Sequence, residues 1–109
     1  MKLFTKAIEN ALKKFPYGSQ DGKGENAKVI ARFFGGSAFT CYILEDEGDG
    51  IFYGLVNIGY GFEYGSISRA ELESLRFPPF GLPVERDSSV DPLKKTLGEC
   101  MKVYGEKLM

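Results

Sequence analysis

The residues with the clearest chemical potential form an acidic run, in which Glu45, Asp46, Glu47 and Asp49 fall within five positions. Carboxylates at this density attract divalent cations or basic proteins. The run lacks the twelve-residue spacing and the closing glutamate of an EF-hand, so no metal site is predicted. Glycines at positions 48 and 50 instead indicate a solvent-exposed hairpin tip. The four carboxylates are therefore candidates for contact with a basic protein partner.

A second stretch of interest, residues 59–65, reads Gly-Tyr-Gly-Phe-Glu-Tyr-Gly. It is not a dinucleotide fingerprint, because the third glycine would fall at Tyr64. Its likeness to the RNA-recognition signature fails at Ile58, Glu63 and Gly65. We interpret it as a glycine-hinged turn whose aromatic rings cover a sheet. Tyr60 and Tyr64 still carry hydroxyls suited to recognition and are candidate binding residues.

A third cluster, Glu85-Arg86-Asp87, follows a proline-rich stretch that withholds backbone donors. Its arginine forms either a buried ion-pair clamp or an exposed edge that binds an anionic ligand. Alternation in an extended segment places Arg86 opposite its neighbours, so Glu71 and Glu73 on the preceding predicted helix are the nearest partners in sequence. We expect a structural clamp. Because a helix points Glu71 and Glu73 to different faces, they do not form a catalytic pair.

The composition excludes several classes of active site and metal site. The chain of 109 residues contains no histidine, which excludes imidazole-based triads and histidine metal sites. Cys41 and Cys100 form no CxxC motif and fall in apolar patterns, so both are expected to be reduced and buried. With a net charge of −1, binding to nucleic acid through bulk charge is not expected. We therefore predict neither catalytic residues nor a cofactor, and rank an enzyme last.

These candidates must be positioned by a small set of elements. Apolar spacing predicts a helix over residues 3–15, ended by Pro16, and a mobile loop over 17–26. Alternating segments predict strands over 28–34, 37–45, 51–58 and 62–67. Ser68 and Glu71 fit a capping box for a helix over 69–76, and residues 77–87 read as an extended edge segment. Asp91-Pro92 reads as the start of a C-terminal helix, whose apolar stripe contains Leu97 and Cys100.

The expected fold is one α+β domain over residues 1–109. It contains an antiparallel β-meander of three to five strands, with the N- and C-terminal helices packed on one face. Residues 33–92 contain ten acidic and three basic side chains, whereas basic residues are in excess in both terminal regions. No apolar segment is long enough for a membrane span, and no signal peptide is evident, so we expect a cytoplasmic protein.

The order of several motifs is similar to an uncharacterised family of small bacterial proteins encoded on conjugative plasmids, integrative elements and phages. The resemblance rests chiefly on Glu-Leu-Glu-Ser-Leu-Arg at 71–76 and Gly-Leu-Pro-Val-Glu-Arg-Asp at 81–87, and extends over most of the chain. Two positions depart from the family pattern: Phe39-Thr40 replaces a usual tryptophan, and Glu63 replaces a proline. The resemblance implies an accessory gene of a mobile element, without a known activity.

Together these observations predict a non-enzymatic accessory protein that acts by binding a protein partner, such as a host-defence component. The acidic sheet region would then mimic nucleic acid toward a basic partner. Two alternatives remain open: a protein that sequesters a nucleotide or another small molecule at the Gly-aromatic turn, and a nucleic-acid accessory factor that uses the lysines of the first helix. The oligomeric state is not predicted.

Overall fold

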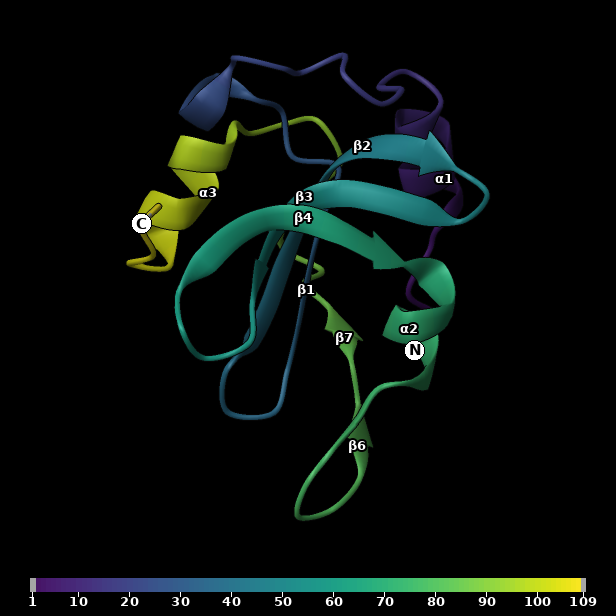
Figure 1. The fold of residues 1–109 in the computed structure, drawn as a ribbon, viewed down its shortest axis with the longest axis vertical. Helices are drawn as coiled ribbons and strands as arrows, with labels where there is room; N and C mark the ends of the chain where they lie inside the picture. Colours follow the sequence, from purple (N-terminus) through teal and green to yellow (C-terminus); the bar gives the residue numbers. More distant parts are fainter. Residues whose placement is uncertain (1, 109) are drawn as a thin grey trace.

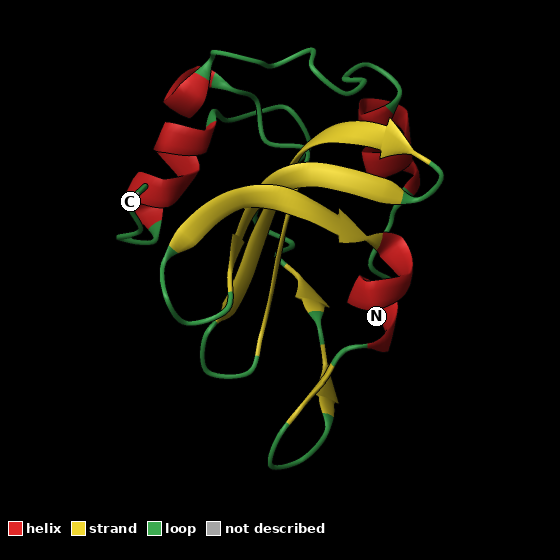
Figure 2. Cartoon of the chain, in the orientation of Figure 1, coloured by secondary structure: helices red, strands yellow, loops and turns green. Residues whose placement is uncertain are grey.

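The computed structural model describes residues 2–108 and shows an α+β fold with a five-stranded antiparallel sheet in the order β4-β3-β2-β1-β7 (Figures 1 and 2). Within that part of the chain no helix is long and apolar enough to cross a membrane. The elements are α1 (Lys6–Leu12), the 3-10 helix η1 (Gly24–Asn26), β1 (Ala31–Gly35), β2 (Phe39–Gly48), β3 (Ile51–Asn57), β4 (Phe62–Ser68), α2 (Arg69–Ser74), β5 (Arg76–Phe77), β6 (Leu82–Pro83), β7 (Glu85–Arg86) and α3 (Leu97–Val103).

Strands β1 to β4 form the predicted meander, in which each strand pairs with the next. The β2–β3 hairpin closes through Asp49 and Gly50, whose φ values of 56° and 75° both lie in the left-handed region. An Asp-Gly pair adopts this conformation readily and matches the twist of the flanking strands. Strand β2 continues to Gly48, so most of the acidic run belongs to the strand. The expected tip at 45–50 is therefore reduced to its last residues.

The meander depends on one close approach between backbones. Gly54 on β3 lies opposite Ile43 on β2 and Gly65 on β4. A Cβ atom at Gly54 would lie 1.8 Å from the carbonyl oxygen of Tyr42, whereas one at Gly65 would meet nothing within 4 Å. Only glycine lets β2 and β3 approach this closely at residue 54.

Alternation along β2 divides the core between the two faces of the sheet. Cys41 and Ile43 belong to a cluster that also contains residues of α1 and α2. Tyr42 and Leu44 belong to a second cluster, which contains Leu97 and other residues of α3. The structure thus differs from the expectation of one helix-covered face, because α3 packs on the face opposite α1 (Figure 1). Both cysteines are free and buried, as predicted.

The N-terminal helix is shorter than predicted. The Thr5 side chain caps it, and it ends at Leu12. The following segment, expected to be a mobile loop, is fastened to the sheet by Gln20, whose side chain is buried. The Gln20 amide donates to the carbonyls of Lys28 and Leu44 and accepts from the Lys28 N–H.

The capping box that begins α2 is present as predicted, with reciprocal hydrogen bonds between Ser68 and Glu71. The extended segment after α2 forms the short β5–β6 pair and then β7, which joins the sheet edge beside β1. Prolines in this segment leave few donors, and its strands are accordingly only two residues long.

The C-terminal helix begins later than expected, at Leu97, where Thr96 and Glu99 form the capping box. The assignment of Asp91-Pro92 as its start was wrong. Residues 93–97 instead form backbone hydrogen bonds with residues 27–29, including Leu93 N–H to Val29 O and Leu97 N–H to Ala27 O. Leu93 has a φ of 63°, which a continuous helix through this segment does not allow.

Candidate functional site

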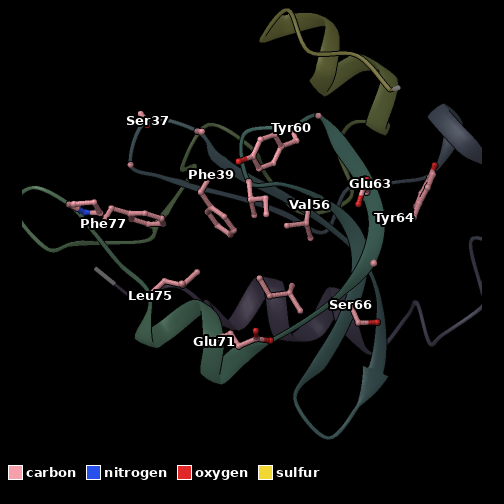
Figure 3. Close-up of a pocket in the computed structure, with 17 residues that line it drawn as sticks. Ser37, Phe39, Val56, Tyr60, Glu63, Tyr64, Ser66, Glu71, Leu75 and Phe77 are labelled. Carbon is pink, nitrogen blue, oxygen red and sulfur yellow. The ribbon is translucent and has the colours of Figure 1, made fainter.

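A groove of about 610 Å³ lies over the face of the sheet that α2 flanks (Figure 3). Its floor contains Phe39 of β2, Val56 of β3 and Ile67 of β4. These residues share one face because side chains alternate along each strand and the strands are in register. Gly65 also lines the groove and leaves open space where a side chain would otherwise stand. The floor is therefore apolar and has room above it.

Two chain segments form the walls. On one side, Leu75 follows α2 and Phe77 of β5 packs over the β1–β2 turn (Figure 3). Cβ atoms at Gly35 and Gly36 would lie 2.3 Å and 2.8 Å from the Phe77 ring. The Phe77 ring can therefore pack against the turn only because both residues are glycines. On the other side, the Tyr60 side chain projects from the β3–β4 loop and is 88% exposed. Such an exposed aromatic ring beside an apolar hollow is a common feature of binding surfaces.

The charges around the groove have one sign. Glu63 and Glu71 line it, and no lysine or arginine does. Glu71 also accepts the Ser68 N–H in the helix cap, whereas no ion pair involves Glu63 among residues 2–108. An apolar hollow with two carboxylates favours a ligand that is apolar and cationic over one that carries phosphate.

The groove runs along β4, which is an edge strand of the sheet. The Arg69 N–H donates to the carbonyl of Gly50. Arg69 and Gly50 are therefore a hydrogen-bonded pair at the end of the β3–β4 ladder, and this pair fixes which residues of β4 bond to β3. In an antiparallel ladder every second residue then directs its backbone groups away from the neighbour. By this alternation Tyr64 and Ser66 point their N–H and C=O groups outward, where another extended chain can pair with them.

The structure separates the candidate residues predicted from the sequence. Tyr60 lines the groove, and Tyr64 stands at its margin with its ring stacked on Tyr53 at 6.0 Å between centroids. Asp46 is half-buried, whereas Glu47 and Asp49 are exposed on the β2–β3 hairpin. Arg86 lies on β7, at the edge opposite β4. A nucleotide site built from Tyr60, Tyr64 and Arg86 together is therefore not assembled.

Glu45 corrects the prediction that the whole acidic run is a solvated tip. Only 2% of its surface is exposed. Its two carboxylate oxygens accept the backbone N–H groups of Gly18 and Gln20, each at 2.8 Å. Glu45 therefore holds the N-terminal loop against the sheet. Its burial follows from the tertiary contact with residues 18–20, which the local sequence does not reveal.

A buried ion-pair network lies next to Arg86 in the sequence and is centred on Arg32. Arg86 donates from Nε to the Lys2 carbonyl at 3.3 Å. Asp87 forms the buried ion pair: its Oδ2 accepts a hydrogen bond from Arg32 Nη1 at 3.0 Å. Arg32 also donates from Nη2 to Glu106 at 2.9 Å and from Nε to the Tyr42 hydroxyl at 3.2 Å. Sequence reasoning assigned no role to Arg32, and only its charge within an apolar strand segment hinted at one.

Hydrogen bonds connect six side chains that we name the Arg32 network: Arg32, Tyr42, Asp87, Ser89, Tyr104 and Glu106. The Tyr104 ring lies 3.8 Å from the guanidinium, and its hydroxyl donates to Asp87. Burial acts to raise the pKa of Asp87, but hydrogen bonds from Ser89 and Tyr104 and the charge of Arg32 lower it below its usual value. Burial and the bond to Glu106 raise the pKa of Tyr42. These mutual contacts join β1 and β2 to the segments around Asp87 and Glu106 and so stabilise the fold.

Among residues 2–108, no group of three potential ligands could hold a metal ion. The comparison with curated proteins and the comparison with solved structures find no match. The scan of family models matches residues 3–103 to the family described as Protein of unknown function (DUF2958). This match covers nearly the whole chain, so the chain belongs to the DUF2958 family.

Proposed function

We propose that this chain is a non-enzymatic accessory protein that binds an extended segment of a partner protein in the groove along β4. The observation that carries the proposal is the combination of an apolar floor with a strand edge that is available at Tyr64 and Ser66, beyond the bridge between Phe62 and Leu108. Phe39, Val56 and Ile67 form one apolar floor beside that edge, and Tyr64 and Ser66 offer backbone groups along it. Extended peptides are recognised in this way when they add a strand to a sheet.

The charges favour a protein segment over a nucleotide. Glu63 and Glu71 supply the only charges among the lining residues, and phosphate groups are ordinarily bound by cations or by helix N-termini. The expected segment alternates apolar residues with polar ones and contains at least one basic residue. The mobile-element setting implied by the family resemblance fits an accessory protein of this kind, with a host-defence component as the candidate partner.

Selection of random linear peptides against the chain tests the proposal, with Gly65→Phe as the blocking variant. A Cβ at Gly65 meets nothing within 4 Å and the residue needs no positive φ, so phenylalanine fills the groove without straining the strand. Lys13→Phe places the same ring at an exposed position outside the groove. We expect Gly65→Phe to weaken the selected peptides about tenfold or more, as loss of one well-packed contact does, and Lys13→Phe to leave them unchanged.

Equal binding to both variants, with both folded by circular dichroism, contradicts the proposal. Nucleotides could instead raise the melting temperature of the parent chain but not of Gly65→Phe. That result would favour a small-molecule ligand over a protein partner. Salt-dependent retention on DNA that both variants keep would point to the nucleic-acid alternative. A host-defence protein as the specific partner is tested with the same pair of variants, by comparing its binding to each.

A further inference from the structure

A second pocket, of about 360 Å³, lies on the opposite face of β4 from the groove floor. We name it the tyrosine pocket. Its lining includes Tyr53 of β3 and Tyr64 of β4, together with the carboxylates of Asp21 and Glu45. The Tyr53 and Tyr64 rings stack with an interplanar angle of 12°. The Tyr17 ring meets Tyr53 edge-on at 5.6 Å and extends the aromatic surface.

The electrostatics of the tyrosine pocket are unbalanced. Glu45 is almost fully buried, and its hydrogen-bond donors are neutral backbone groups. Neither Glu45 nor Asp21 takes part in an ion pair within residues 2–108, and no lysine or arginine lines the pocket. Burial of the ring, followed by the charges of Tyr17, Glu45, Tyr64 and Asp21, raises the pKa of Tyr53. Carboxylates and aromatic faces therefore create a negative potential, which no lysine or arginine among the described lining residues offsets.

We propose that the tyrosine pocket receives a lysine or arginine side chain of the partner protein. An organic cation gains from ring faces and from carboxylates at the same time, and a guanidinium also stacks on a planar ring. Tyr64 borders both the groove and the tyrosine pocket, so one polypeptide crossing β4 reaches both. This inference rests on the proposed function, since the cation belongs to the protein that occupies the groove.

Titration with a short arginine peptide, Ac-Gly-Arg-Gly-NH2, tests this inference, followed by the backbone amide signals of Gln20, Tyr53 and Tyr64 in nuclear magnetic resonance. The matched probe replaces arginine with citrulline, which has the same shape without the charge. We expect the arginine peptide to shift these amide signals in a saturable way, and a peptide with lysine in place of arginine to do the same. The citrulline peptide should bind at least about tenfold more weakly, because the pocket recognises the charge.

Two variants test whether the cation binds in the tyrosine pocket. Asp21→Asn removes an exposed carboxylate that lines the pocket, and Asp91→Asn removes an exposed carboxylate that does not line it. Asp21→Asn should weaken the arginine peptide about fivefold, while Asp91→Asn should change it less than about twofold. Equal binding of arginine and citrulline, or equal effects of the two variants, overturns the inference. If groove peptides still distinguish Gly65→Phe from Lys13→Phe in that case, the proposed function stands without the cation site; if they do not, both fall.

Discussion

Replacing Arg32 with methionine is the most informative perturbation of this fold. The Arg32 side chain is 9% exposed, and its partners Asp87 and Glu106 are 10% and 18% exposed. Methionine keeps most of the aliphatic stem but leaves two carboxylates facing each other without a cation. Breaking a buried pair in this way costs about 3–5 kcal/mol. In a chain of this size, the melting temperature should then fall by about 12 °C or more.

The chain supplies a matched control in Arg69. This arginine also meets two carboxylates, Glu9 at 3.6 Å and Glu73 at 3.4 Å, and lies 4.6 Å from the ring of Phe4. Its side chain is 38% exposed, so water screens the interactions that burial strengthens around Arg32. Arg69→Met should therefore cost about 1 kcal/mol. Urea denaturation monitored by circular dichroism measures both variants.

A further variant distinguishes two causes of the destabilisation: the lost attraction between Arg32 and its partners, and the cost of burying carboxylates without a cation. Adding Asp87→Asn and Glu106→Gln to Arg32→Met removes the two uncompensated carboxylates. If stranded charge causes most of the loss, this triple variant should be more stable than Arg32→Met alone. Equal losses for Arg32→Met and Arg69→Met, or a triple variant less stable than the single one, would refute the reasoning from burial.

Three other predictions follow from the structure. Gly54→Ala should destabilise the chain by about 3 kcal/mol or prevent folding, because its Cβ would collide with the Tyr42 carbonyl. Gly65→Ala, on the paired strand, should cost less than about 1 kcal/mol in the same urea titration. Burial raises the pKa of Cys41 to about 12, so this thiol should resist Ellman's reagent at pH 8 in the native protein and react once urea unfolds it. Because the folded pKa of Asp87 is lowered from 3.8, its contribution should be present above that value and lost as the pH falls through the folded pKa; the stability difference between the parent chain and Asp87→Asn should shrink in urea titrations below about pH 4.

The sheet was predictable because its signals are local. Strand alternation, the Asp49-Gly50 turn and the Ser68–Glu71 capping box each depend on residues close in sequence. The start of α3 was not predictable in this way. Asp91-Pro92 has the residue types of a helix start, but hydrogen bonds from Leu93 and Leu97 to residues 27–29 override that preference.

The candidate site was predicted only in part. Tyr60 and Tyr64 were singled out because exposed aromatics in a glycine-rich turn stand out locally. The groove itself needs Phe39, Val56 and Ile67 from three strands, and their common face emerges only once the register is known. The burial of Glu45 likewise depends on contacts 25 and 27 residues away, which no local pattern encodes.

The Arg32 network also has a consequence for the order in which the fold assembles. Its ion pairs join residues separated by 55 and 74 positions, whereas the β2–β3 hairpin closes through two residues. Closing long loops costs more chain entropy, so the hairpins are expected to form before the network. Interactions absent from the transition state act on the unfolding rate and leave the folding rate nearly unchanged. Arg32→Met is therefore expected to speed unfolding while leaving the folding rate nearly unchanged, so that Arg32 sets how long the native state persists.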